Sequence, residues 1–540
     1  MVKIVVTELG GSLVGQEIEC CKGQSICDAL RDAGVHIEVP CGGAGTCGKC
    51  KVKVLNVELL PDVITSERIN LMDEEIRAGV RLACMTTVVD GLMVRVDHSL
   101  NGALHGAVVE TWVAEQGSSL SPAVDPGDIQ GRAVGMAIDI GTTTIAAFFY
   151  DLKSGEQVDV IGEMNEQRVY GSDVMSRIRT ASEQVGYLKI MQQTVIEQLN
   201  RMVKRFCERH GLDVNCIADM VVTGNTVILH LFAGLDVASL GQAPYAPVSV
   251  FGECCSAATL GLNMRDNAEV YIMPCVSGFF GGDAVAAMMA VGFCEMLGNV
   301  QSETVYMADI GTNGEIGLIH QGKAYVCSTA AGPAFEGAHI QFGMGSVPGA
   351  ISKVWMQENA MLCETIEDQP VIGICGSGLI DAAAVAVQLS IIDEAGSIEE
   401  DSVYAAETDH GEAIMLTDKV YITGKDIREI QLAKAAISAG TTVLLETAGI
   451  TAEQVDVVQI AGGFGSKINA RNAAVIGMWP ERFGELAQAA GNAAGAGAVM
   501  CLLDVDRRRD AERLAKAAET VELTMNQSFE GAFVEALMFG

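Results

Sequence analysis

Apolar and polar positions alternate with a period of two in short runs over the first hundred residues. This alternation predicts strands at residues 2–8, around 51–57 and at 92–97, with a short helix in the stretch SICDALRDAG. A stretch rich in Ser, Pro, Gly and Asp, containing GSSLSPAVDPGD, follows and is typical of a linker. We therefore expect a small mixed domain over residues 1–97 and a linker over residues 98–130.

From residue 131 the pattern changes to longer apolar runs, glycine-rich turns and amphipathic helices. Two similar segments, GMAIDIGTTTIAAFFYDL at 135–152 and VYMADIGTNGEIGLIHQG at 305–322, each predict a strand, an Asp-Ile-Gly-Thr turn and a second strand. The chain is therefore expected to be an α/β multidomain protein whose second part has two related lobes. We expect a middle domain at 131–210 and a C-terminal domain at 211–540.

Composition limits the partners. With 69 acidic and 35 basic residues, the formal net charge of −34 disfavours nucleic acid and membrane surfaces. No uncharged apolar run is long enough to span a bilayer, and the first residues do not form a secretion signal, so we expect a cytoplasmic protein. Seventeen cysteines fit reduced thiols and a metal site better than a disulfide framework.

Four cysteines have a spacing typical of a metal site. Cys41, Cys47 and Cys50 follow the pattern C-x5-C-x2-C, and Cys84 comes later in RLACMTT. Thiolates suit iron-sulfur clusters or zinc. The intervening glycines let the loop wrap tightly and direct backbone N–H groups at sulfur. A zinc site usually uses two closely spaced cysteine pairs, and the late, single Cys84 fits that arrangement poorly. Zinc is therefore the less favoured alternative.

The five-residue gap between the first two of these cysteines resembles the adrenodoxin-like [2Fe-2S] ferredoxins. The resemblance covers about the first 97 residues and includes the strand-helix-strand order of a β-grasp domain. It implies that Cys41, Cys47, Cys50 and Cys84 hold a [2Fe-2S] cluster.

The two Asp-Ile-Gly-Thr turns are candidate phosphate sites. Successive N–H groups and hydroxyls in such a turn can bind phosphate oxygens, while Asp139 or Asp309 reaches a metal ion or its bound water. The candidate contacts are Gly141, Thr142, Thr143 and Thr144 in the first turn, and Gly311, Thr312, Asn313 and Gly314 in the second.

A third candidate element is the glycine loop in VDVVQIAGGFGSKINARN. There Gly462, Gly463 and Gly465 would let the backbone approach a nucleotide closely. The pattern is not GxGxxG, and no GxxxxGK[ST] motif occurs, which argues against a Rossmann dinucleotide site and excludes a P-loop.

Two acidic phosphate turns followed by a late glycine loop resemble the actin, sugar kinase and Hsp70 ATPase superfamily, which implies ATP and Mg²⁺ in a cleft between two lobes. Residues 221–230 and 374–387 fall where that superfamily has its connecting segments. Gln431 and Lys434, at i and i+3 of a predicted helix, match positions that touch adenosine in relatives, or alternatively face solvent. We interpret Asp283 as a helix cap rather than a magnesium contact.

A ferredoxin domain, a linker and an actin-like ATPase on one chain resemble the reductive activators of corrinoid-dependent enzymes along essentially the whole length. VYGSDVMSRI and CSTAAGPAFEGAHI add to this resemblance. It implies ATP-dependent, one-electron reduction of the Co(II) corrinoid of a methyltransferase or corrinoid protein to Co(I), as in O-demethylation and other anaerobic metabolism.

The same resemblance implies catalytic roles for Asp139 and Asp309 and an external low-potential electron donor. Ser328 and Thr329 are candidate hydroxyls facing the partner, and a homodimer is one candidate assembly.

Three other functions fit parts of the sequence. One is an actin-fold small-molecule kinase with a redox-sensing ferredoxin domain, and another is an Hsp70-like binding module whose cluster stabilises the fold. The third is the activator class for 2-hydroxyacyl-CoA dehydratases. We disfavour the last because that family binds its cluster between subunits and lacks an N-terminal ferredoxin.

Overall fold

The computed structural model describes residues 2–8, 16–33, 37, 45, 48, 50–71, 73–96, 120–128, 131–171, 173–358, 360–463, 465–523 and 526–539. The chain divides into two compact units. Unit 1 comprises Met1–Gly106 and Glu166–Gln184, and unit 2 comprises Ala107–Asn165 and Val185–Gly540.

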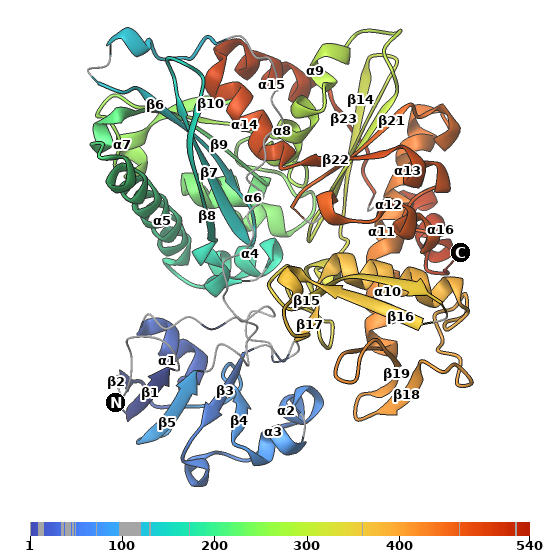
Figure 1. Ribbon diagram of the computed structural model, residues 1–540. Helices are drawn as coiled ribbons and strands as arrows, with labels where there is room; N and C mark the ends of the chain where they lie inside the picture. The colour runs from blue at the N-terminus through green and yellow to red at the C-terminus, as the bar shows by residue number, and fades with distance from the viewer. Residues whose placement is uncertain are drawn as a thin grey trace. The chain divides into compact units, whose positions relative to one another are not determined.

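Unit 1 contains a five-stranded mixed sheet in the order β2-β1-β5-β3-β4, drawn in blue in Figure 1. Its elements are β1 Val2–Glu8, β2 Gln16–Cys20, α1 Ile26–Asp32, β3 Lys51–Val54, α2 Thr65–Asn70, α3 Asp73–Arg77, β4 Val80–Leu82, β5 Leu92–Val96 and, in its second segment, α4 Val174–Glu183. Strand β1 pairs in parallel with β5 and antiparallel with β2. The predicted strands and short helix are confirmed, whereas β2 and β4 were not predicted.

Unit 2 contains two six-stranded sheets, in the orders β10-β11-β9-β6-β7-β8 and β22-β21-β12-β13-β14-β23. The strands of the first are β6 Val134–Ile140, β7 Thr144–Asp151, β8 Gln157–Met164, β9 Ile217–Gly224, β10 Glu253–Ser256 and β11 Glu269–Ile272. Those of the second are β12 Val305–Ile310, β13 Gly314–His320, β14 Lys323–Thr329, β21 Val457–Ala461, β22 Ala487–Gly491 and β23 Glu519–Thr520. In each sheet a three-stranded antiparallel meander is extended by a parallel strand, β9 on β6 and β21 on β12. This shared topology confirms the two related lobes.

Helices and two small sheets complete unit 2. The helices are α5 Tyr187–His210, α6 Thr226–Ala233, α7 Ala257–Leu260, α8 Gly282–Ala290, α9 Phe293–Met296, α10 Gly376–Gln388, α11 Gly424–Ala448, α12 Ala470–Val475, α13 Glu481–Leu486, α14 Ala493–Leu503, α15 Val505–Ala517 and α16 Gln527–Glu535. The small sheets comprise β15 Ala350–Gln357, β16 Ala360–Thr365 and β17 Gly373–Ile374, and β18 Ala405–Thr408, β19 Gly411–Met415 and β20 Tyr421–Thr423.

Helices α8 and α14 pack against each other between the two large sheets (Figure 1). A Cβ at Gly497 of α14 would clash with the backbone of Ala286 in α8, so glycine permits this close crossing. One apolar core contains residues of both helices and of both sheets. Helices α8 and α14 therefore join the lobes. The segments predicted for that position, 221–230 and 374–387, form β9 with α6, and α10. That prediction was wrong because hydrophobic pattern does not reveal which helices pair.

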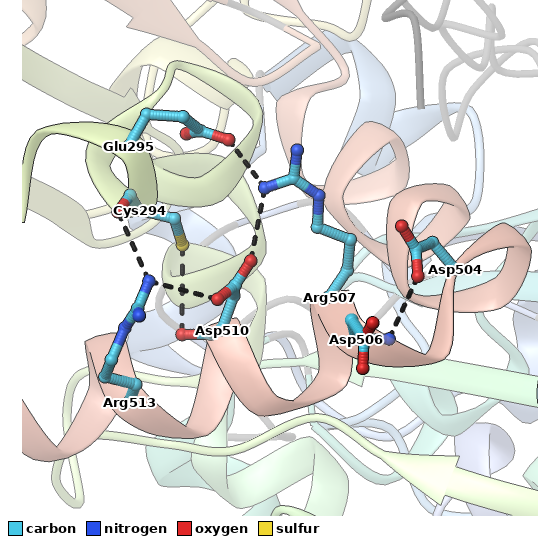
Figure 2. Close-up of polar contacts among 7 residues, drawn as sticks. All are labelled: Cys294, Glu295, Asp504, Asp506, Arg507, Asp510 and Arg513. Atoms are coloured by element: carbon cyan, nitrogen blue, oxygen red, sulfur yellow. Dashed lines mark hydrogen bonds and ion pairs between the residues drawn. The ribbon is translucent and has the colours of Figure 1, made fainter. Parts of the chain in front are cut away.

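Polar contacts fix α15 onto α9, as Figure 2 shows. The guanidinium of Arg507 pairs with Glu295 and with Asp510, and that of Arg513 pairs with Asp510 at 3.0 Å. The Cys294 thiol donates to the Asp510 carbonyl at 3.8 Å. At the start of α15, Asp504 accepts from the amide of Asp506 at 3.0 Å.

Part of the predicted linker belongs to unit 2. The Ser121 amide donates to the Leu503 carbonyl, and the Val505 amide donates to the Ser121 carbonyl, both at 2.8 Å. Across the ranges that the structure describes, no helix combines enough length and apolar character to cross a membrane.

Candidate functional site

The two Asp-Ile-Gly-Thr turns occupy equivalent places, at the ends of β6 and β12. The Gly141 amide donates to the Thr144 carbonyl at 2.8 Å, and the Gly311 amide donates to the Asn313 carbonyl at 2.9 Å. Each bond closes a tight turn directly after an aspartate. The turns differ in the residue paired across the hairpin, which is Ala146 opposite Asp139 and Glu315 opposite Asp309.

Two asparagines hold the first turn. The Asn165 side chain donates to the Gly141 carbonyl and its backbone amide donates to the Thr143 carbonyl, each at 2.8 Å. The Asn225 side chain donates to the Thr142 hydroxyl at 3.2 Å, while its oxygen caps α6. The turn is therefore fixed before any ligand arrives.

Two side chains contact the second turn. The Thr312 hydroxyl donates to a carboxylate oxygen of Glu336 at 2.7 Å. The Thr329 hydroxyl donates to the Gly314 carbonyl at 3.4 Å, and Thr329 is only 2% exposed. The expectation that Thr329 faces a partner was therefore wrong, because this hydroxyl is buried behind the turn.

The glycine loop after β21 reaches the second aspartate. Gly462 has a φ of +89° and lies against Asp309, so that a Cβ at this position would clash with the carboxylate. Its amide donates to the Gly491 carbonyl at 3.2 Å. Gly463 is exposed and Gly465 is buried at the start of a short 3₁₀ turn.

Asn492 links this region to the first turn. Its side-chain amide donates to Asp139 at 3.2 Å, and its side-chain oxygen accepts from the Gly495 amide at the start of α14. The three predicted motifs therefore meet in one place, where α14 leaves the second sheet.

Four carboxylates share this place. Burial raises the pKa of Asp309 to about 6. Burial and the charge of Asp309 raise the pKa of Asp139 to about 7, against the lowering effect of the Asn492 hydrogen bond. Burial, followed by the charges of Asp139 and Asp309, raises the pKa of Asp283 to about 8. Burial, followed by the charges of Asp283 and Asp309, raises the pKa of Glu315 well above its usual value.

Each of these four side chains is still partly accessible to solvent. Within the described ranges, no Lys or Arg forms an ion pair with any of them. Nor do three His, Cys, Asp or Glu side chains of the described residues converge closely enough to ligate one ion. Magnesium usually keeps several waters and takes one or two carboxylates, so this all-oxygen, uncompensated set fits a hydrated Mg²⁺.

Sequence reasoning missed Glu315, Glu336 and Asn492, and it assigned Asp283 to a helix cap. Asp283 is not the cap of α8, since that position is Gly281 and Asp283 lies within the first turn. The register of the second hairpin could have revealed Glu315, because Asp309 and Glu315 lie six positions apart on either side of the turn and pair across it. No local signal marks Asn492.

Gln431 and Lys434 share one face of α11, as predicted, but they do not face solvent. They are 2% and 0% exposed. The Gln431 side chain donates to the Leu537 carbonyl at 2.8 Å, while the Lys434 ammonium donates to the Met538 carbonyl and lies 5.0 Å from the centre of the Phe539 ring. Burial lowers the pKa of Lys434 to about 8. Both side chains hold the C-terminal segment, and their contact with adenosine stays a prediction.

Two of the four predicted cluster ligands lie side by side in unit 1. The Sγ atoms of Cys50 and Cys84 are 3.2 Å apart, close enough for both to bind one metal atom at about 2.3 Å. Cys41 and Cys47 lie outside the described residues. The placed pair of thiols fits the predicted [2Fe-2S] cluster.

Neighbouring residues orient this pair. Glu67, 3% exposed, accepts from the Leu82 amide and the Thr86 hydroxyl, both at 3.2 Å, and so holds the turn that carries Cys84. The Asn70 side chain donates to the carbonyl of Gly45, whose φ is +71°. Hydrogen bonds of this kind fix ligand positions before a metal binds.

Three family profiles match consecutive parts of the chain. Residues 9–89 match a 2Fe-2S iron-sulfur cluster binding domain, residues 134–296 match the RACo middle region, and residues 303–540 match the C-terminal domain of RACo, the ASKHA domain. These matches support a [2Fe-2S] cluster in the first part and nucleotide binding in the last. They also confirm the expected α/β multidomain fold with a ferredoxin-type domain and an actin-like domain.

Two characterised relatives are similar over most of their length. The corrinoid activation enzyme RamQ of Eubacterium limosum is 27% identical, with 98% of both chains aligned. The [Co(II) methylated amine-specific corrinoid protein] reductase of Methanosarcina barkeri is 25% identical over 75% of this chain and 77% of the relative. The solved structure of a reductive activator for corrinoid, iron-sulfur protein covers 100% of this chain and 98% of its own, with 28% identity and a TM-score of 0.70.

Proposed function

Because the chain belongs to the family of RACo-type reductive activators of corrinoid proteins, we propose that it transfers one electron from a [2Fe-2S] cluster to the Co(II) corrinoid of a partner protein, in a reaction that depends on ATP. The observation that carries the proposal is the meeting of both Asp-Ile-Gly-Thr turns, the glycine loop and Asn492 around uncompensated carboxylates. The family accounts for the ferredoxin unit, and this group of turns and carboxylates supports a nucleotide site.

Cys41, Cys47, Cys50 and Cys84 would hold the cluster, which supplies a one-electron relay when bound. In unit 1, Glu67 holds the turn that carries Cys84, and Cys50 is buried. An external low-potential donor would provide the electron. We also propose that the chain divides into four parts, with boundaries at residues 97, 130 and 210.

The two turns would bind the nucleotide phosphates through their amides and hydroxyls. Asp139 and Asp309 would hold Mg²⁺ through its waters, and the ion would neutralise triphosphate charge when bound. Asp283 lies beside both aspartates and is the candidate to accept a proton from the attacking water. Gly462 leaves the room that the Asp309 carboxylate needs.

Because ATP does not itself donate electrons, a nucleotide contributes by changing the conformation of the protein. Each 59 mV of uphill one-electron transfer costs about 1.4 kcal/mol. A nucleotide that binds the closed lobes more tightly than the open lobes can supply such energy by favouring one state of the activator and its partner. Closure of the lobes would act on helices α8 and α14, which pack against each other between them.

The test compares the wild type with Asp309→Asn at equal cluster content. We expect the variant to lose at least about tenfold in ATP-dependent reduction of a Co(II) corrinoid protein, followed by its visible spectrum, because a neutral amide does not hold the hydrated ion. Glu364→Gln, which alters an exposed carboxylate paired with Lys353, is the control. Unchanged ATP-dependent reduction in Asp309→Asn would contradict the proposal.

A further inference from the structure

Glu336 is held next to the second phosphate turn by its neighbours. It ends the short 3₁₀ turn Ala334–Glu336, and both Ala334 and Phe335 are 2% exposed in the core of the second lobe. The next residue, Gly337, has a φ of +83°, and a Cβ there would clash with the backbone of Met344. The segment on both sides of Glu336 is therefore fixed, while its own side chain stays partly accessible to solvent.

The contact between Glu336 and Thr312 determines what the Thr312 hydroxyl can do. This hydroxyl has a single hydrogen, which it donates to Glu336 at 2.7 Å. Phosphate oxygens only accept hydrogen bonds. In this state the Thr312 hydroxyl therefore cannot donate to a phosphate oxygen. The corresponding contact in the first turn is different, because Thr142 accepts from the neutral amide of Asn225.

The charge of Glu336 acts in the same direction. A carboxylate within hydrogen-bond distance of the turn repels a phosphate that carries no cation and attracts a cation that arrives with the phosphate. Among the residues that the structure describes, Glu336 is the carboxylate that accepts from the Thr312 hydroxyl of this turn.

We propose that Glu336 makes nucleotide binding depend on a divalent cation: it retains the Thr312 hydroxyl until the cation of a metal–nucleoside triphosphate complex engages its carboxylate, and the hydroxyl then turns to the phosphate. This inference rests on the proposed function, since it assumes that the second turn binds nucleotide phosphate. It assigns Glu336 a positioning role through Thr312 and a discriminating role between metal-bound and metal-free nucleotide.

The test measures the dissociation constant of ATP for the full-length protein by calorimetry, once with excess Mg²⁺ and once with EDTA. The readout is the dissociation constant measured with EDTA divided by the dissociation constant measured with Mg²⁺. In Glu336→Gln, the side chain keeps its shape and can still accept from Thr312, but its charge is absent. We expect metal-free ATP to bind about five- to tenfold more tightly, and Mg-ATP, whose cation loses this carboxylate, to bind no more tightly than in the wild type. The ratio therefore falls by at least that factor.

Thr312→Val tests the other half of the inference. The variant keeps the shape of the side chain and loses the hydroxyl. We expect Mg-ATP to bind about five- to tenfold more weakly, whereas metal-free ATP, to which the hydroxyl was never available, binds as in the wild type. Glu364→Gln is the matched control and should keep the wild-type ratio. Thermal unfolding of each variant verifies that it is folded.

The outcomes separate the two proposals. If the wild type binds Mg-ATP and both Glu336→Gln and Thr312→Val keep its ratio, the role of Glu336 is wrong while the nucleotide site stands. If the wild type binds ATP neither with Mg²⁺ nor without it, the proposed function fails, and the inference fails with it.

Discussion

Burial raises the pKa of all four carboxylates of the site, and neighbouring carboxylates raise it further for Asp139, Asp283 and Glu315, so their ionisation destabilises the protein without metal or nucleotide. Asp309, Asp139 and Asp283 have folded pKa values of about 6, 7 and 8, above the ordinary value of 3.8. Between about pH 4 and pH 8 the folded state therefore binds more protons than the unfolded state. The free energy of unfolding must fall as the pH rises through this window.

This sign gives a prediction for the metal-free protein. In EDTA we expect the melting temperature to fall by roughly 3 °C or more between pH 6 and pH 8, and added Mg²⁺ with nucleotide to raise it more at pH 8, where fewer protons must leave. Asp283→Asn should flatten the profile, while Glu364→Gln should keep the wild-type slope. A wild-type melting temperature that rises between pH 6 and pH 8 would contradict the raised pKa values of these carboxylates.

Individual site residues were predictable only where a local pattern marks them. Asp139 and Asp309 follow strands and precede glycines, so the turn chemistry identified both. Asp283 and Asn492 enter the site because α8 and α14 cross, which is a tertiary event without a local signature. Gln431 and Lys434 were predicted to share a helix face, but the C-terminal segment that buries them is distant in the sequence and has no local signature either.

At the level of elements, α15 shows how differently two adjacent arginines contribute. Arg508 is 5% exposed, and its guanidinium pairs with the fully buried Asp219 and donates to the Cys501 carbonyl at 3.0 Å. Arg509 pairs with Asp506, but their side chains are 79% and 71% exposed. Desolvation makes the first pair costly to break, and solvent screening makes the second nearly neutral.

We therefore expect Arg508→Ala to lower the free energy of unfolding by about 3–5 kcal/mol, because it leaves the Asp219 charge buried without its cation. Arg509→Ala, the matched change on the same helix, should alter it by less than about 1 kcal/mol. Urea denaturation measures both. Adding Asp219→Asn to Arg508→Ala should recover part of the loss. Equal losses for the two arginine variants would contradict the role assigned to the buried pair.

At the level of the whole molecule, the sequence was sufficient for the architecture because two signals repeat or cluster along the chain. The paired Asp-Ile-Gly-Thr segments predicted two related lobes, and the early cysteines predicted a separate metal domain; the sheet topology and family matches confirm both. The lobe-joining helices were misplaced, since α8 and α10 are similarly apolar and alanine-rich and only packing distinguishes them.

The division into two compact units predicts that the cluster and the nucleotide site can be disabled separately. Cys84→Ser replaces a thiol that lies 3.2 Å from Cys50, so we expect the visible iron-sulfur spectrum and ATP-dependent corrinoid reduction to be lost. The affinity for Mg-ATP should stay within about twofold of the wild type, because the residues proposed to bind the nucleotide lie in unit 2 with a core of their own. Cys21→Ser, an exposed cysteine of the same unit, is the control and should keep both properties.

Two results would contradict this prediction. Zinc in place of iron in the purified wild type would remove the electron relay, whatever the nucleotide affinity. Loss of Mg-ATP binding together with the spectrum would mean that the cluster supports the fold of both units, as in a nucleotide-switched binding module. Retained Mg-ATP binding with lost reduction would show that reduction needs the cluster of unit 1 even when the proposed site of unit 2 binds nucleotide.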